Sequence, residues 1–130
     1  MLVWKPEYSI GVSSIDVQHK YLFEIIGNAF KLLKKDVCVD KYEGIAIIIQ
    51  DICQYAKYHF KTEEKYMIRI NYEGYSSHKI DHDYFIQYIN KINLEQVKGD
   101  PQKYIEDILA FLFNWLVDHI LMKDMLIKVE

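Results

Sequence analysis

Residues 45–67, IAIIIQDICQYAKYHFKTEEKYM, decide the fold of this chain. Apolar residues recur along the stretch in steps of three and four, which is the spacing of one face of an α-helix. Towards its end, the same face changes from aliphatic residues to a histidine and a glutamate. We therefore predict a helix whose buried side carries polar groups. Its inward residues are Ile45, Ile49, Ile52, Ala56, His59, Glu63 and Met67.

Three further segments show the same helical spacing, over residues 15–35, 75–92 and 101–124. Each has an apolar inward face that is interrupted by histidine at one level. Capping and turn-forming residues stand close to the expected helix ends. The expected helix starts are Ser13 and Ser14 for the first helix, a capping box of Asp40 and Glu43 for the second, Tyr75 for the third, and Asp100 with Pro101 for the fourth.

The four segments predict an all-α fold. Helices joined by short connections favour antiparallel neighbours, and inward positions in steps of three and four suit shallow packing angles. We expect an up-down-up-down antiparallel four-helix bundle over about residues 14–127. Residues 1–12 are expected to form an extended N-terminal arm carrying Trp4 and Tyr8. A chain of 130 residues is long enough for one buried core, so we expect a single domain over residues 1–130.

The composition argues against several classes of protein. A net charge of −3 gives no basic excess for binding nucleic acid. The start, MLVWKPEYSIG, has a proline and a glutamate where a signal peptide needs an apolar core, and no apolar run is long enough for a membrane span. Two cysteines, Cys38 and Cys53, suit a reducing compartment better than a disulfide framework. We therefore expect a cytoplasmic protein.

All five histidines fall on inward faces of the predicted helices, and two carboxylates fall beside them. Burying an imidazole or a carboxylate without a partner costs free energy, and seven such groups would exceed the marginal stability of a small domain. Histidines that pack without a metal are therefore a poorer explanation than ligands of metal ions. The seven predicted ligands are His19, His59, Glu63, His78, His82, His119 and Asp124.

The spacing of these donors fits helices that face a common centre. The second helix has its histidine and glutamate four residues apart, and the third has its two histidines at the same spacing. Such pairs project from one face on successive turns. His119 and Asp124 are five residues apart, which should spread them around the fourth helix. We expect one of them to cap an ion while the other reaches across as a bridge.

The donor types narrow the metal without fixing it. Imidazole-rich sites accept zinc, copper, nickel or iron. The absence of thiolate ligands and of a closed four-ligand cluster argues against structural zinc. Seven donors and a bridging oxygen fill two octahedra except for one position, where a small molecule can bind.

With these residues, the chain resembles the hemerythrin family, in particular the single-domain bacterial hemerythrins, over essentially its whole length. A member of this family, myohemerythrin, is a standard example of the up-down-up-down bundle, so the resemblance implies the same topology. The matching motifs are Trp4 and Gly11, Ile15-Asp16-Val17-Gln18-His19, His59-Phe60-Lys61-Thr62-Glu63-Glu64 with Met67, His78-x-x-x-His82-x-x-Phe85, Trp115-Leu116-Val117-Asp118-His119-Ile120, and Asp124.

The resemblance implies a centre of two iron ions with a bridging oxo or hydroxo group. It implies three groups of ligands: His78, His82 and His119 on a coordinatively full iron, His19 and His59 on an iron with a vacant position, and Glu63 and Asp124 as bridges between them. It also implies an apolar lining for an oxygen pocket, at Leu22, Phe60, Trp115, Leu116 and Ile120. Taken singly, each of these lining residues is better explained as core packing.

The function implied by the resemblance is reversible binding of dioxygen for carriage, storage or delivery, and not catalysis. An unidentified oxygen-accepting protein is a possible partner. Two alternatives stay open: a di-iron enzyme that reduces dioxygen, peroxide or nitric oxide, and an oxygen or redox sensor. The Glu-x-x-His pairs of carboxylate-rich di-iron oxidases are absent from the sequence, which favours binding over turnover.

Overall fold

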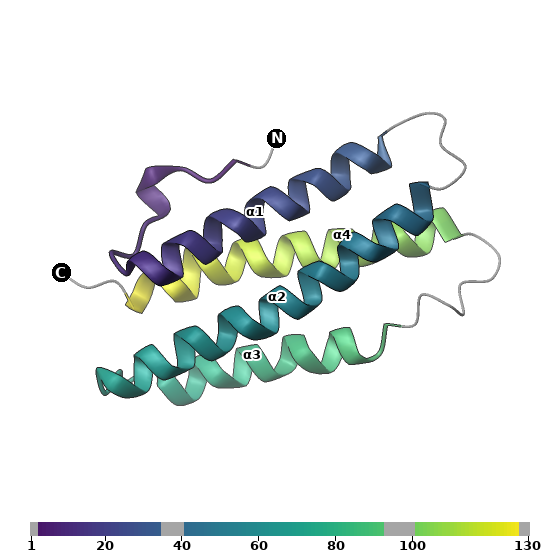
Figure 1. Cartoon of the computed structure of the whole chain (residues 1–130). Coiled ribbons are helices and arrows are strands. Elements are labelled where there is room, and N and C mark those ends of the chain that lie inside the picture. Colours follow the sequence, from purple (N-terminus) through teal and green to yellow (C-terminus); the bar gives the residue numbers. More distant parts are fainter. Residues whose placement is uncertain (1–2, 35–40, 93–100, 128–130) are drawn as a thin grey trace.

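The computed structural model describes residues 3–34, 41–92 and 101–127. Four long helices dominate this part of the chain, in which no strand occurs: α1 (Ser13–Leu33), α2 (Lys41–Arg69), α3 (Tyr75–Asn90) and α4 (Pro101–Asp118). Figure 1 shows that each helix runs opposite to the one before it. The predicted all-α, up-down-up-down four-helix bundle is therefore confirmed.

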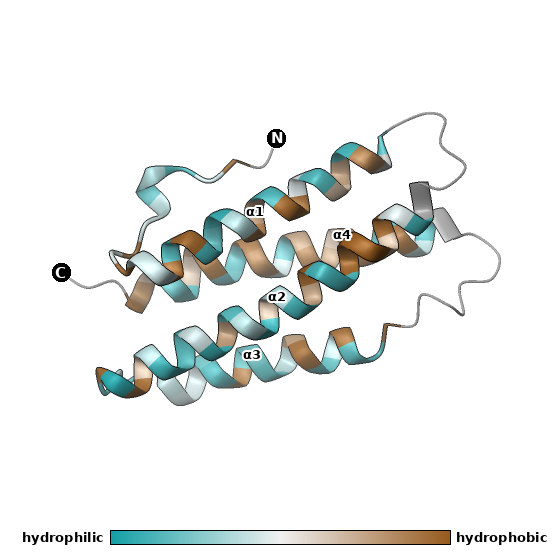
Figure 2. Ribbon diagram, viewed as in Figure 1, coloured by the Kyte–Doolittle hydropathy of each residue, from teal (hydrophilic) through white to brown (hydrophobic). Residues whose placement is uncertain are grey.

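The predicted inward faces form the core of the bundle. Hydrophobic and hydrophilic residues alternate along each helix in Figure 2, as expected when one side is packed and the other meets water. A buried leucine or isoleucine side chain stabilises the fold by about 1.5–3 kcal/mol relative to an exposed one. The core holds Leu22, Ile26, Ala29, Ile45, Ile49, Ile52, Ala56, Phe60, Phe85, Ile89, Ile105, Ile108, Leu109, Leu112 and Leu116.

The first helix begins differently from the prediction. Ser13 and Ser14 lie inside α1, the residue before the helix is Val12, and no side chain caps this end by a hydrogen bond. The carboxylate of Asp16 reaches back instead. It accepts hydrogen bonds from the Ser9 hydroxyl at 2.6 Å and from the Ile10 backbone N–H at 2.8 Å. The arm that precedes the helix, and not a serine cap, therefore ties down this end.

Apart from the end of the fourth helix, the other helix ends agree with the prediction to within two residues where they are described. Helix α1 ends at Leu33, α3 begins at Tyr75 as predicted and ends at Asn90, and Pro101 is the first residue of α4. The proposed caps Asp40 and Asp100 lie outside the described residues. Local signals thus predicted the starts of α3 and α4 correctly. For α4 the signal is the proline, which loses no hydrogen bond at the first helical position.

The last helix does not continue regularly to its end. After Asp118 the chain forms a π-helical turn, η3 (His119–Lys123), followed by a 3₁₀ turn, η4 (Asp124–Ile127). The backbone N–H of Asp124 donates to the carbonyl of His119, five residues earlier. This change of helix type falls directly on two of the predicted ligands.

The N-terminal arm runs along one side of the first half of α1, as Figure 1 shows. It contains a short 3₁₀ turn, η1 (Pro6–Tyr8). Tyr8 packs edge-on against Phe23, with ring centroids 5.8 Å apart, and the Lys20 ammonium lies 4.5 Å from the centre of the Trp4 ring. The arm is therefore held against α1 by aromatic contacts as well as by Asp16.

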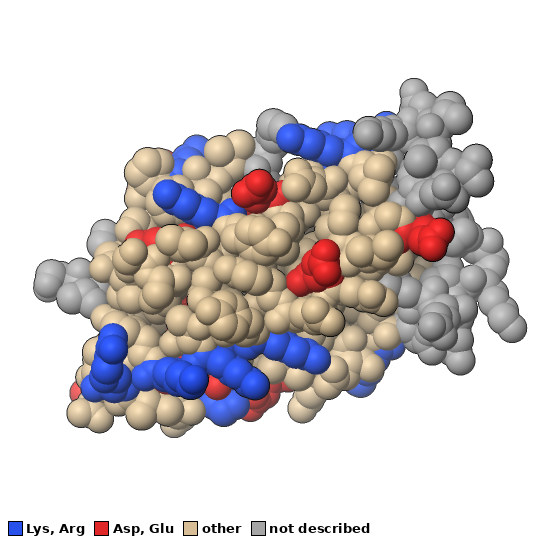
Figure 3. Space-filling view, viewed as in Figure 1, with Lys and Arg blue, Asp and Glu red and all other residues tan. Residues whose placement is uncertain are grey.

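The surface is mixed in charge. In Figure 3, basic side chains gather along the lower edge, over α2 and α3, while the middle of this face is mostly uncharged. None of the helices in the described ranges has the length and hydrophobicity that crossing a membrane requires.

Candidate metal centre

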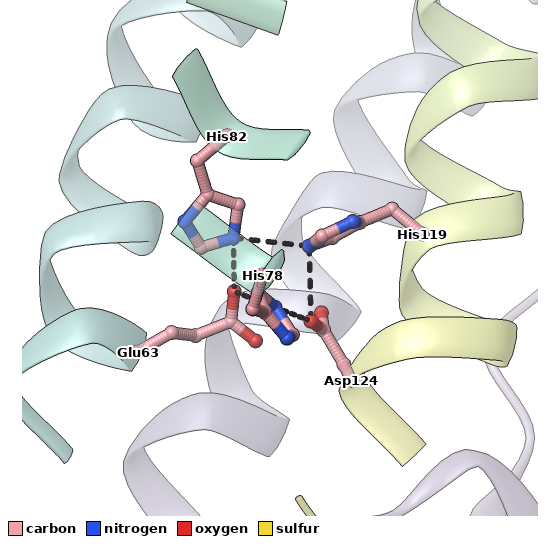
Figure 4. A group of neighbouring side chains, drawn as sticks. All are labelled: Glu63, His78, His82, His119 and Asp124. Carbon is pink, nitrogen blue, oxygen red and sulfur yellow. Dashed lines mark hydrogen bonds and ion pairs between the residues drawn. The ribbon is translucent and has the colours of Figure 1, made fainter. Parts of the chain in front are cut away.

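The seven predicted ligands come from helices α1, α2 and α3 and from the two turns that follow α4, and they meet inside the bundle. Each is at most 5% exposed to solvent. Figure 4 shows five of them, with the side chains from α2, α3 and the end of the chain pointing towards one another. The contributions are His19 from α1, His59 and Glu63 from α2, His78 and His82 from α3, His119 from η3, and Asp124 from η4.

Five of these residues form one group of potential ligands, in which every donor atom lies within 4.8 Å of the others: Glu63, His78, His82, His119 and Asp124. The Nε2 atoms of His78 and His119 lie 2.8 and 3.1 Å from Asp124 Oδ1. The Nε2 of His82 lies 3.2 Å from Glu63 Oε1 and 3.0 Å from the Nε2 of His119. Three imidazoles and two carboxylates thus surround one position.

A second group of potential ligands contains four residues: His19, His59, Glu63 and Asp124. The Nε2 of His19 lies 2.8 Å from Asp124 Oδ2, and the Nε2 of His59 lies 3.3 Å from Glu63 Oε1. The two imidazole Nε2 atoms are 3.1 Å apart. Glu63 and Asp124 belong to both groups, so each carboxylate lies where it can connect two ions. We call these sets the five-donor and the four-donor group.

The expectation that His119 and Asp124 are spread around the helix is wrong. In a π-helical turn, residues five apart are joined by a backbone hydrogen bond and lie on the same side. Their side chains consequently approach to 3.1 Å, between His119 Nε2 and Asp124 Oδ1. Asp124 still reaches both groups, because its Oδ2 faces His19 while its Oδ1 faces His78 and His119.

The chain is similar to known proteins over most of its length. Residues 10–128 match the family model "Hemerythrin HHE cation binding domain". The chain belongs to the hemerythrin family. The "Bacteriohemerythrin" of Clostridium acetobutylicum is 41% identical over 124 residues, which cover 95% of this chain and 96% of that protein. The "Hemerythrin-like protein" of Naegleria gruberi is 29% identical over 96% of this chain and 89% of its own length. A "Bacteriohemerythrin" of Pseudomonas aeruginosa is 27% identical over 92% of this chain and 74% of its own length.

Membership of the hemerythrin family and the two donor groups support an iron-binding, oxygen-related function. The donors themselves also fit a metal. Within the described residues, both carboxylate oxygens of Glu63, the Nε2 of His78 and Oδ1 of Asp124 are buried, and their contacts, including the 2.8 Å approach of His78 Nε2 to Asp124 Oδ1, do not have hydrogen-bond geometry. Native proteins leave few buried polar atoms in this state, and each one needs an explanation. Metal ions between the seven side chains would supply the missing partners.

The electrostatics of this hemerythrin-type centre point the same way. Burial raises the pKa of the Glu63 carboxyl well above its usual range, and the nearby Asp124 charge adds to the effect. Burial would also raise the pKa of Asp124, but the contacts with His119, His19 and His59 outweigh it and hold that pKa well below its usual range. Burial lowers the pKa of His59 to about 4 and also lowers the pKa of His82. Neutral imidazoles are the form that binds a metal ion, and the charge of two cations would favour ionisation of the Glu63 carboxyl.

Two polar neighbours of the centre were given no role from the sequence, and the first of them is Gln18. It is 5% exposed, and its Oε1 lies 2.7 Å from the Nδ1 of His59. Its Nε2 donates to the Thr62 hydroxyl oxygen at 3.1 Å, and that hydroxyl donates to the Tyr58 carbonyl at 3.2 Å. The contact joins α1 to α2 across 41 residues of sequence, so helix periodicity alone could not reveal it. A polar residue directly beside a predicted ligand was the available signal.

Glu64 is the second unassigned neighbour. Its Oε2 lies 2.8 Å from the Nδ1 of His82, and its Oε1 lies 3.8 Å from the Lys79 ammonium. Partial burial raises the pKa of Glu64, while the Lys79 charge opposes that shift. The residue follows a predicted ligand and points away from the core by helical periodicity, which is why it resembles an ordinary surface glutamate in the sequence.

The predicted pocket-lining residues divide into two kinds. Leu22, Phe60, Leu116 and Ile120 are each at most 1% exposed, whereas Trp115 is only partly buried. The ring of Phe60 stacks on that of His82 with centroids 4.0 Å apart, and Trp115 stacks on His119 at 4.6 Å. Trp115 also lines a surface depression of about 260 Å³, together with Asp81, Asp118, His119, Met122 and Lys123. The two aromatic residues thus cover ligand imidazoles, one from within the core and one from the surface.

Proposed function

We propose that this hemerythrin-family chain binds dioxygen reversibly at a pair of non-haem iron ions held by the seven converging side chains. The observation that carries the proposal is the division of the donors into a five-donor and a four-donor group that share Glu63 and Asp124. A pair of iron ions, when bound, supplies the two electrons that dioxygen accepts on binding and returns on release.

The unequal groups explain where a small ligand would bind. With two ions bound, five side chains and a bridging oxo or hydroxo group would supply six ligands to one ion, whereas four side chains and the same bridge would leave the other ion one ligand short. His19 and His59 would be the imidazoles that hold the second ion. Glu63 and Asp124 would hold the two ions at a fixed separation, because each belongs to both groups.

The apolar residues that are predicted to line the oxygen pocket support binding over turnover. Leu22, Phe60, Leu116 and Ile120 are buried side chains without titratable groups, and a lining of such residues admits neutral dioxygen while excluding water and protons. Five imidazoles with two carboxylates also carry less negative charge than the carboxylate-rich centres of di-iron oxidases, which disfavours high oxidation states of iron. We therefore rank a dioxygen carrier above an oxygen-reducing enzyme, and both above a sensor.

The test is a visible absorption spectrum of the reduced, iron-loaded protein, recorded without air, in air, and after purging with inert gas. A carrier is expected to show an absorption band that appears in air and disappears on purging over repeated cycles. A Glu24→Leu variant, changed on the exposed side of α1, should behave like the wild type. A band that persists after purging would contradict reversible binding and support oxidation of the iron.

A further inference from the structure

The two donor groups differ in the residues that contact the Nδ1 atoms of their imidazoles, on the side away from the centre. For an imidazole to coordinate a metal through Nε2, its proton must sit on Nδ1. The Nε2 of His59 faces the centre, 3.3 Å from Glu63 Oε1, and the Nε2 of His82 faces it at 3.2 Å from the same oxygen. The partner of each Nδ1 therefore decides whether each ring is ready to bind.

The partner of His59 is an amide whose orientation is itself fixed. The Thr62 hydroxyl uses its proton on the Tyr58 carbonyl, so its oxygen can only accept from Gln18. Gln18 must then turn its Nε2 towards Thr62 and its Oε1 towards His59, at 2.7 Å. An amide oxygen accepts, and the proton of His59 is therefore held on Nδ1. Thr62 sets the tautomer of His59 through Gln18.

The partner of His82 is a carboxylate, which needs no such orientation because either oxygen accepts. Glu64 places Oε2 at 2.8 Å from the Nδ1 of His82 and Oε1 at 3.8 Å from Lys79. A hydrogen bond to a charged acceptor is stronger than one to a neutral amide, and it makes the imidazole a stronger electron donor at Nε2. The remaining imidazole of the four-donor group, His19, has an Nδ1 that is buried without any partner in the described ranges.

We propose that Gln18 and Glu64 are positioning residues that fix the tautomers of His59 and His82, and that their difference in charge makes the five-donor group the tighter metal site. This rests on the proposed function, since it requires that the seven side chains hold two ions. The five-donor group gains both from its extra ligand and from the Glu64 carboxylate. In the four-donor group, a neutral amide accepts from the Nδ1 of His59, and the described residues offer no partner to the Nδ1 of His19, so this group binds its ion second.

The test uses zinc added to the metal-free chain, because zinc is diamagnetic and does not react with dioxygen. Metal binding is then measured separately from oxygen binding. Nitrogen-15 NMR of labelled histidine reports the protonated ring nitrogen and the order in which the imidazoles bind. Expected are Nδ1–H tautomers for His59 and His82, and binding of the first zinc by His78, His82 and His119. The second zinc should then shift His19 and His59.

Two variants test the roles of Gln18 and Glu64 independently. Thr62→Val frees the Gln18 amide to turn, and should weaken the second zinc by about 10-fold with a mixed tautomer at His59. Glu64→Gln should weaken the first zinc by about 10–100-fold and leave the second unchanged. Asp83→Asn is the matched control for charge, because Asp83 is an exposed carboxylate on α3 that pairs with Lys79 and not with a ligand imidazole.

The outcomes are distinguishable. If the wild type binds two zinc ions but both variants match Asp83→Asn in affinities and tautomers, the positioning roles are wrong while the metal centre stands. A proton on Nε2 of His59 in the zinc-loaded wild type, or loading of the four-donor group first, would equally overturn the inference. Failure of the wild type to bind two ions would overturn both the inference and the proposed function.

Discussion

His119 and Asp124 are five residues apart, and the π-helical turn between them brings the Nε2 of the first to 3.1 Å from Oδ1 of the second. A regular α-helix would place residues at this spacing about 140° apart around its axis. Because Asp124 lies in both donor groups, this local change of helix type determines whether one carboxylate can serve two ions. The irregular turn is therefore part of the candidate metal centre and not a frayed helix end.

Removing the Glu63 carboxylate should stabilise the metal-free protein. Both of its oxygens are buried without a hydrogen bond in the described ranges, so the folded state carries their desolvation cost. We expect Glu63→Leu to raise the free energy of unfolding by about 1–3 kcal/mol in the presence of a chelator, measured by urea denaturation. The same variant should lose tight binding of two ions. A lower stability of metal-free Glu63→Leu would show that the imidazoles of His59 and His82, whose Nε2 atoms lie 3.3 and 3.2 Å from Glu63 Oε1, stabilise the carboxyl group without a metal.

The two donor groups predict different results for two histidine variants. His19→Ala leaves the five-donor group complete, so we expect it to retain one tightly held iron per chain after dialysis against a chelator. His119→Ala removes a ligand from the five-donor group, so the iron ion in that group should be held more weakly. Iron per chain is the measurement, and Val17→Ala, at a position 60% exposed on α1, should retain two. If His119→Ala kept two tightly bound ions, the assignment of His119 would be wrong.

Truncating Phe60 should affect both the fold and the centre. The side chain is 1% exposed, stacks on His82 and packs against Phe85 with ring centroids 5.4 Å apart. We expect Phe60→Ala to cost about 3–5 kcal/mol in urea denaturation, because it leaves a cavity in the core. Water in that cavity should also speed oxidation of the reduced iron-loaded protein in air. Tyr58→Ala, at a position 58% exposed on α2, is the control and should change stability by less than about 0.5 kcal/mol.

The thiol of Cys53 should be unreactive at ordinary pH. Cys53 is a free cysteine that packs beside the core, and burial raises its pKa to about 11 from a usual 9.0, with Lys57 opposing the shift. The thiolate is the reactive form, so the folded protein should react with an alkylating reagent about 100-fold more slowly at pH 8 than the unfolded chain. The rate, measured in a Cys38→Ser background, should rise with pH towards a midpoint near 11. A midpoint near 9.0 would show an unperturbed thiol.

Periodicity was enough to predict the bundle, because one side of each helix is buried along nearly its whole length. Ile45, Ile49 and Ile52 are at most 1% exposed, as their spacing predicts. The convergence of the seven polar side chains was also predictable, since unpartnered imidazoles and carboxylates rarely occupy a buried helix face. The assignment of Ser13 and Ser14 as helix caps failed because the carboxylate of Asp16 engages the arm instead.

The details that tune the centre could not be predicted from the sequence. The segment from His119 to Asp124 contains no glycine or proline that would mark a π-helical turn. The contact between Gln18 and His59 depends on how α1 packs against α2. Such features arise from tertiary packing, which local spacing does not encode. The expectation that residues 1–130 form a single domain stays a prediction.

The most direct test of the central claim is a crystal structure of the iron-loaded protein with anomalous scattering recorded at the iron edge. The account predicts two iron peaks per chain. One should lie among His78, His82 and His119, the other beside His19 and His59, with Glu63 and Asp124 between them. A single peak, or two peaks away from these seven side chains, would contradict the proposed centre.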